Sequence, residues 1–200
     1  MTDRFCNLNG AVFLNYGYLQ APTGVYFSGN FTILTWIKNK EYLSPSTIFN
    51  FGKNQDSATD IVVFRLNYGT PKFITDNFMS SLETYSFYFN TDVWYHIGLV
   101  LQDKIGSIYV NGKKVASGPM SAPENVQRNF NYFGRSSDVM DSNANAIYDE
   151  MKIYSIALNN EQISYDYLSS SSNGKLMFHL FQVFFRMIIN YILLGMLPTC

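Results

Sequence analysis

The sequence predicts an all-β fold: one antiparallel two-sheet sandwich of the jelly-roll type, with a C-terminal hydrophobic helix outside the sandwich. Short apolar runs recur about every ten residues between Gly, Pro, Asn and Ser, which is typical of sandwich strands and turns. The 15 Tyr and 17 Phe favour strands, because aromatic side chains pack well on a pleated surface. A chain of 200 residues, 47% of them apolar, can bury one full core and is short for two.

The segment 31–37 is predicted to be a central strand, because it is rich in β-branched and aromatic residues. Its side chains alternate between two faces, namely Phe31, Ile33, Thr35 and Ile37 on one and Thr32, Leu34 and Trp36 on the other. A buried indole contributes a large apolar area. We therefore expect Trp36, and Trp94 in a later strand, to be more than half buried.

A three-strand antiparallel meander is the clearest local prediction. Its strands are 94–101, 106–110 and 113–116, with turns at 102–104 and at Asn111-Gly112. Asn-Gly tolerates positive φ at both central positions of a type I′ turn, whose twist matches the flanking strands. Further strands are expected at 11–20, 46–51, 60–67, 84–89, 129–134 and 146–154.

The domain is predicted to end near residue 168. The stretch 159–165 begins with the capping residue Asn159 and indicates a short helical turn that closes the domain. The following segment 169–174 is a flexible linker by composition, with four serines, an asparagine and a glycine. This gives a sandwich domain over 1–168, a linker over 169–174 and a hydrophobic helical tail over 175–200.

Within that tail, residues 176–197 are almost wholly apolar and long enough to span a bilayer. The polar residues among them, His179, Gln182, Arg186 and Asn190, fall close to one face of a helix. A central arginine costs about 2.5–3.5 kcal/mol on insertion scales. Three interpretations stay open: a membrane-spanning helix, an interfacial amphipathic helix, and an extension foreign to the domain.

Charge and cysteine content exclude several classes of protein. The formal net charge is −1 with acids and bases interspersed, so we expect no nucleic-acid binding. Cys6 and Cys200 lie at opposite ends, without the clustering of a zinc site, and two free thiols are favoured over a disulfide between the termini. Residues 1–20 lack a secretory signal, so either the protein is intracellular or its N-terminus is missing.

Several stretches, in this order and spacing, resemble the laminin-G-like jelly-roll domains of the concanavalin A-like lectin/glucanase superfamily. They are GNFTI (29–33) with Trp36, WYHI (94–97), IYVNG (108–112), NYFGRS (131–136), and YDEMKIY (148–154) leading into Ala157-Leu158 and 161–163. The resemblance implies a non-catalytic recognition or adhesion module that binds glycans or proteins. It also implies a fragment of a larger extracellular or cell-surface protein, with membrane anchoring through 176–197 left open. The ligand and its binding residues stay unknown.

The resemblance has one departure. The family normally has another strand and loop before the position that matches Asp3-Arg4-Phe5, and Cys6 stands where a glycine is usual. The sandwich is therefore expected to be N-terminally incomplete, with an unpaired edge or a gap in one sheet.

A glycan-cleaving enzyme would need two carboxylates on one strand face. Asp149 and Glu150 are adjacent, and neighbouring strand residues are expected to point to opposite faces, so we predict that the protein is not an enzyme. His96 shares its predicted face with apolar neighbours and is interpreted as a structural histidine rather than part of a Ser-His-Asp arrangement. A degenerate glycan-cleaving sandwich and a purely structural spacer domain stay as alternatives.

Two further sites are predicted from loop residues. A Ca²⁺ site would use Asp149 together with Asp138 and Asp141 in the loop just before it, since a hard cation binds several oxygens. Asn30 begins the sequon Asn30-Phe31-Thr32 and is an N-glycosylation site if the protein is secreted.

Overall fold

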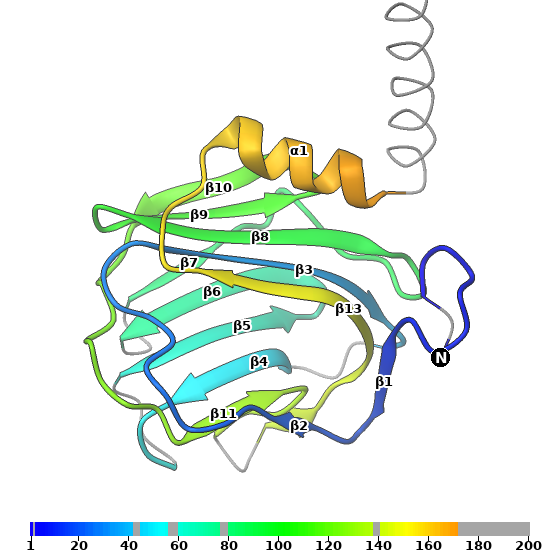
Figure 1. Cartoon of the computed structure of the whole chain (residues 1–200), viewed down its shortest axis with the longest axis horizontal. Coiled ribbons are helices and arrows are strands. Elements are labelled where there is room, and N and C mark those ends of the chain that lie inside the picture. The colour runs from blue at the N-terminus through cyan, green and yellow to red at the C-terminus, as the bar shows by residue number, and fades with distance from the viewer. Residues whose placement is uncertain (2, 42–44, 56–59, 77–79, 138–140, 172–200) are drawn as a thin grey trace, which may run out of the picture.

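The computed structural model describes residues 1–171 except 2, 42–44, 56–59, 77–79 and 138–140. Two β-sheets pack face to face, and one helix, α1 (Asn160–Ser170), lies on the outside of the first sheet (Figure 1). The predicted all-β sandwich is confirmed.

The six-stranded sheet carries the strands that contact α1. Its order is β1 (Val12–Asn15), β13 (Asn145–Tyr154), β3 (Phe31–Asn39), β8 (Tyr95–Gln102), β9 (Ile105–Val110) and β10 (Lys113–Pro119), and all neighbours are antiparallel. The central position of β3 confirms the prediction for 31–37.

The seven-stranded sheet closes the other side of the sandwich. Its order is β2 (Leu19–Gln20), β11 (Phe130–Phe133), β4 (Ser46–Gly52), β5 (Ile61–Asn67), β6 (Thr70–Asp76) and β7 (Ser81–Glu83), and β12 (Ser142–Asn143) runs parallel to β4. The jelly-roll arrangement follows because the consecutive strands β4 to β7 form this sheet while β8 to β10 form the other.

The two faces of β3 divide the core as the alternation predicts. Phe31, Ile33 and Ile37 enter the main core between the sheets. Leu34 and Trp36 lie on the opposite face, below α1, where Leu34 joins a second small cluster. Trp36 is 5% exposed, and Trp94 is partly buried just before β8. Both predictions of a largely buried indole are confirmed.

The predicted meander is also confirmed. Asn111 and Gly112 have φ of 50° and 75°, as a type I′ turn requires, and join β9 to β10. The turn between β8 and β9 has the same geometry at Asp103 and Lys104, with φ of 49° and 64°.

The structure differs from the strand predictions at three places. The segment 84–89 is a loop, although Phe87 and Phe89 within it pack into the core side as strand residues would. The strand β6 was missed because Pro71 lies inside it and because its hairpin with β5 turns at Tyr68-Gly69 rather than at a recognisable Asn-Gly. The predicted strand 11–20 is divided into β1 and β2, which belong to different sheets.

The helix α1 is longer than the predicted helical turn. Asn159 caps it by a reciprocal capping box with Gln162, which satisfies two backbone N–H groups. Its last residues, Ser169 and Ser170, come from the segment predicted as linker. The membrane-helix prediction over 176–197 and Cys200 lie outside the described residues, and in the described part no helix is long and apolar enough to cross a membrane.

One side of β13 is only half covered. β1 pairs with β13 at 145–148, and the pairing stops there, while β3 pairs with both halves of β13. Among the described residues, the second half of β13 therefore has a strand partner on one side only. Whether the sandwich is N-terminally incomplete stays a prediction.

Candidate functional site

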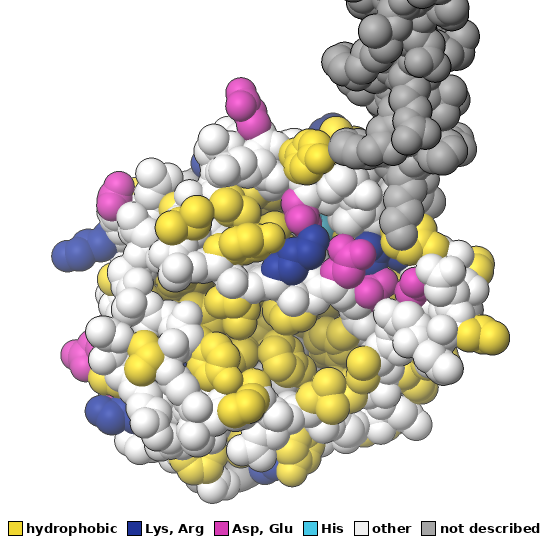
Figure 2. Space-filling view, viewed as in Figure 1, with side chains coloured by type: hydrophobic (Ala, Val, Ile, Leu, Met, Phe, Trp, Pro, Cys, Tyr) yellow, Lys and Arg dark blue, Asp and Glu magenta, His cyan; other side chains and the backbone are white. Residues whose placement is uncertain are grey.

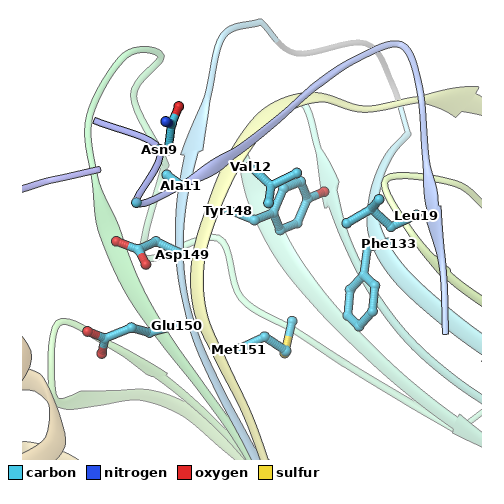
Figure 3. Close-up of a pocket in the computed structure, with 10 residues that line it drawn as sticks. Asn9, Ala11, Val12, Leu19, Phe133, Tyr148, Asp149, Glu150 and Met151 are labelled. Atoms are coloured by element: carbon cyan, nitrogen blue, oxygen red, sulfur yellow. The ribbon is translucent and has the colours of Figure 1, made fainter. Parts of the chain in front are cut away.

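A β-bulge in β13 changes the geometry of the predicted acidic pair. The pairing of β13 with β3 shifts between Asp149 and Lys152, and Glu150 has φ of 48°. Both carboxylates consequently lie on one side of β13, opposite to Tyr148 and Met151 (Figure 3). The expectation that Asp149 and Glu150 point to opposite faces is wrong, because the bulge interrupts the alternation.

Arg4 pairs with both carboxylates. Its guanidinium forms ion pairs with Asp149 and, at 2.7 Å, with Glu150, and its side chain is only 4% exposed. Arg4 also lies 4.7 Å above the ring of Trp36 and donates a hydrogen bond of 2.8 Å to the carbonyl oxygen of Ser170. Burial raises the pKa of Asp149, an effect that the attraction of Arg4 only partly offsets.

The charged cluster continues beneath α1. Lys152 Nζ lies 3.4 Å from Glu150 and 2.6 Å from Asp166, and His96 Nε2 lies 3.0 Å from the other oxygen of Asp166. Burial pushes the pKa of Asp166 upward, but its hydrogen bonds with His96 and Lys152 outweigh burial and hold that pKa below its usual value. The cluster joins β8 and β13 to α1.

His96 occupies a structural position in this cluster. Its side chain is fully buried, packs edge-on against Trp36 and bonds to Asp166 of the helix. These contacts fit the interpretation of His96 as a packing residue.

Two of the three residues of the predicted Ca²⁺ site form ion pairs with arginines. Asp149 pairs with Arg4, Asp141 lies 4.0 Å from Arg65, and Asp138 falls outside the described residues. No group of three or more metal-ligating side chains occurs in the part that the structure describes. Ca²⁺ binding stays a prediction. If the site exists, Ca²⁺ should raise the melting temperature of the protein, and Asp149→Ala should abolish that rise.

Asn30 lies just before β3 and is partly buried. Its Nδ2 donates to Asp103 Oδ1 at 3.2 Å, and its Oδ1 accepts from the backbone N–H of Asp103 at 2.8 Å. The hydroxyl of Thr32 in the same sequon is buried against Ile156 and Leu158. Glycosylation of Asn30 stays a prediction.

An apolar cavity of about 260 Å³ lies between β13 and the pair β2 and β11. Figure 2 shows apolar side chains gathered in a hollow on this face, next to a row of charged ones. The side chains that point into the cavity in Figure 3 are apolar apart from the phenol of one tyrosine: Val12, Leu19, Phe133, Tyr148 and Met151. The hydroxyl of that tyrosine, Tyr148, donates to the carbonyl oxygen of Ile48, so the cavity offers few groups that could hydrogen-bond a polar ligand.

A second, larger cleft of about 470 Å³ has the opposite character. It lies on the outer face of the six-stranded sheet, where the start of α1 meets the β8–β9 turn and β10. Its lining combines apolar side chains with amide, hydroxyl, carboxylate and ammonium groups: Val100, Gln102, Asp103, Ile105, Ser107, Tyr109, Lys114, Leu158, Asn159 and Asn160. We call this the polar cleft.

The polar cleft has a fixed floor and free polar groups at its rim. Tyr109 is buried, and its hydroxyl donates to Asn160 Oδ1 at 2.5 Å, while Lys114 Nζ lies 5.4 Å from the centre of its ring. Within the described residues, the amide of Gln102 and the ammonium of Lys114 form no hydrogen bond with protein. Both side chains are therefore available to a ligand.

Sequence reasoning did not find these rim residues. The sequence predicts Gln102 in a turn, Asn159 at a helix cap and Lys114 in a strand, and nothing in it indicates that the three positions line one cleft. They converge only because α1 folds back over β8 to β10 (Figure 1).

Comparisons with known proteins agree with this fold. A family profile described as the concanavalin A-like lectin/glucanases superfamily matches residues 13–164. No curated protein matches the sequence.

Solved structures similar to this chain include domain 4 of an extracellular arabinanase from Geobacillus stearothermophilus in complex with arabinotriose. That domain is 19% identical with a TM-score of 0.64, over 77% of this chain and 74% of the domain. The binding domain of botulinum neurotoxin serotype G is 16% identical with a TM-score of 0.60, over 82% of this chain and 46% of that domain. Trypanosoma rangeli sialidase is 17% identical with a TM-score of 0.56, over 73% of this chain and 24% of the sialidase. At these identities, the likeness shows the fold.

Proposed function

Since this chain belongs to the concanavalin A-like lectin/glucanase superfamily, we propose that it is a non-catalytic recognition domain that binds a glycan in the polar cleft. The observation that carries the proposal is that Gln102 and Lys114, at the rim of a cleft of about 470 Å³, form no hydrogen bond with the described part of the protein.

The chemistry of the cleft supports a sugar. A sugar ring has an apolar C–H face and a rim of hydroxyl groups, so it needs an apolar wall together with several hydrogen-bonding groups. Val100, Ile105 and Leu158 supply the wall, and Gln102 and Lys114 supply donors. The volume lies within the roughly 300–1,000 Å³ of typical small-molecule sites.

The structural relatives support recognition as the role. The arabinanase domain is described in complex with arabinotriose, and the toxin relative is described as a binding domain. The arabinanase is described as extracellular. We extend both properties to this chain as part of the proposal: glycan recognition, in an extracellular or cell-surface setting.

The absence of catalysis is also a proposal. Glycosidases need two carboxylates that flank an open site, about 5–10 Å apart. Here Asp149 and Glu150 share the guanidinium of Arg4 and point away from the apolar cavity (Figure 3). An assay of hydrolysis on the glycans that bind tests this part: turnover that is lost in Glu150→Gln would contradict it.

The cleft is tested with a matched pair of lysines. Lys114 lines the cleft, whereas its neighbour Lys113 is exposed on the same strand and is not part of the cleft lining. We expect wild-type protein to bind one or more glycans on an array, Lys114→Met to lose at least tenfold in affinity for them, and Lys113→Met to bind as wild type. Equal affinities of the two variants would assign binding elsewhere.

A further inference from the structure

Three tyrosines are exposed at the end of the sandwich opposite to the polar cleft. Tyr68, Tyr85 and Tyr88 are 77%, 70% and 58% exposed. They lie on two loops, the β5–β6 turn and the segment between β7 and β8. Single exposed tyrosines are common on protein surfaces, whereas a group of them on adjoining loops indicates an interaction site.

Backbone hydrogen bonds hold the two loops together. The N–H of Phe89 donates to the carbonyl oxygen of Gly69 at 2.9 Å, and the N–H of Thr84 donates to that of Pro71 at 3.4 Å. The segment 84–89 therefore runs along the turn that carries Tyr68. We call Tyr68, Tyr85 and Tyr88 the tyrosine rim.

Core aromatics anchor the same segment from below. Phe87 and Phe89 pack 5.0 Å apart, and both contact Tyr95 at the start of β8, with ring centres 5.7 and 4.7 Å away. The inward phenylalanines alternate with the outward tyrosines. The rim is thus preorganised, so binding a ligand would cost little conformational entropy for ordering the loop.

The backbone at Tyr68 adopts a strained conformation. Tyr68 has φ of 48°, a left-handed conformation that favours Asn or Gly at this turn position. Its side chain is 77% exposed, the most of the three tyrosines, so burial of the phenol contributes little that would offset this strain. A strained residue whose side chain faces solvent indicates a role in recognition.

The polar surroundings of the rim indicate an uncharged ligand. Charged side chains on the same segments or next to them form ion pairs, Lys72 with Glu83 at 3.4 Å and Asp92 with Lys40. Hydroxyl groups of Thr84 and Ser86 alternate with the tyrosines along the loop. Flat phenol rings and hydroxyl groups match the C–H faces and hydroxyl groups of a sugar chain.

From these observations we infer that the tyrosine rim is a second glycan-binding surface, which takes a neutral oligosaccharide by stacking of sugar rings on the phenols. The inference rests on the proposed role in glycan recognition. β8 separates the rim from the polar cleft by its eight residues, or about 25 Å, so one short oligosaccharide cannot occupy both sites.

Protection from tyrosine nitration by tetranitromethane tests the rim directly. The probes are four neutral trisaccharides: arabinotriose, cellotriose, maltotriose and chitotriose. We expect at least one of them to slow nitration of all three rim tyrosines several-fold, as read by peptide mass spectrometry. Tyr165, which is 59% exposed on α1, is the internal control and should react at an unchanged rate. If none of the four protects the rim, or if Tyr165 is protected equally, the inference is overturned.

Variants separate the rim from the cleft. A triple variant Tyr68→Phe, Tyr85→Phe and Tyr88→Phe keeps the rings and should keep most of the affinity for the protecting trisaccharide, whereas the triple Tyr→Ser variant should lose at least tenfold. Lys114→Met should leave rim protection unchanged. If Lys114→Met abolishes array binding and the Tyr→Ser variant changes no trisaccharide affinity, the rim inference fails and the proposed function stands. If Lys114→Met changes no array binding and the Tyr→Ser variant loses trisaccharide affinity, the cleft proposal fails and the rim inference stands.

Discussion

The indole Nε1 of Trp36 donates a hydrogen bond of 3.0 Å to the hydroxyl of Ser170, which joins the central strand β3 to the last residue of α1. Ser170 is buried, and its hydroxyl also donates to the carbonyl oxygen of Asp166. The serine therefore satisfies two buried polar groups at once.

We expect Ser170→Ala to lower the free energy of unfolding by about 1–2 kcal/mol, because the indole N–H would stay buried without a partner. Ser169→Ala is the control, since the hydroxyl of Ser169 contacts only the carbonyl oxygen of Asp166 at 3.2 Å. Urea unfolding of both variants measures the difference. Equal stability of the two variants would show that the hydrogen bond to Trp36 contributes nothing.

Gly112 is required by both its backbone and its neighbours. It has φ of 75°, and a Cβ there would lie 3.1 Å from a ring carbon of Tyr167 and 3.3 Å from the Cα of Ser164 in α1. We expect Gly112→Val to destabilise the protein by more than about 1 kcal/mol, because a β-branched residue is strained at positive φ. Gly17→Ala, with open space around it, should leave the melting temperature unchanged. A melting temperature unaffected by Gly112→Val would contradict the turn geometry.

Asp166 makes the free energy of unfolding depend on pH in the acidic range. Its folded pKa lies below its usual value, so the ionised form stabilises the native state. This contribution is fully present above the unfolded pKa of about 3.9 and is lost as the pH falls through the lower folded pKa. We expect wild type to lose more stability than Asp166→Asn when urea unfolding at neutral pH is compared with unfolding near pH 3. Lys152→Met, which removes a partner of Asp166, should also reduce this loss. Identical acid dependence of wild type and Asp166→Asn would refute the assignment.

The fold was predictable because its signals are local and repeated. Alternation in β3 placed Trp36 and Phe31 on opposite faces, and Asn111-Gly112 located a turn, since each pattern depends only on neighbouring residues. The serines at 169–170 resemble a linker by composition, and the contacts of Ser170 with Trp36 and Arg4 place this end of α1 in the domain. Tertiary contacts of this kind have no sequence signature.

The candidate site was not predictable for a related reason. The β-bulge at Glu150 contains no glycine, the residue that would indicate a bulge in the sequence. It is stabilised by Arg4, which lies 146 positions away in the sequence. The polar cleft likewise has Gln102 and Asn159 in its lining, and the two belong to one cleft only after α1 has docked on the sheet. Local patterns therefore identified the sandwich, while the surfaces that could bind a ligand depend on how distant segments pack.

Substitution of Tyr68 tests whether this tyrosine of the rim lowers the stability of the fold. At φ of 48°, an asparagine is less strained than a tyrosine, and the exposed phenol contributes little packing that would be lost. We expect Tyr68→Asn to raise the free energy of unfolding by about 0.5–1 kcal/mol, in the range of other turn-optimising substitutions. Tyr85→Asn, at a position without positive φ, should not stabilise the protein. Urea unfolding of both variants, beside nitration protection by the same trisaccharides, gives the two readouts. A gain in stability together with a loss of protection would mean that Tyr68 is present for binding, whereas a loss of stability in Tyr68→Asn would mean that the phenol supports the fold and would remove the strain argument for the rim.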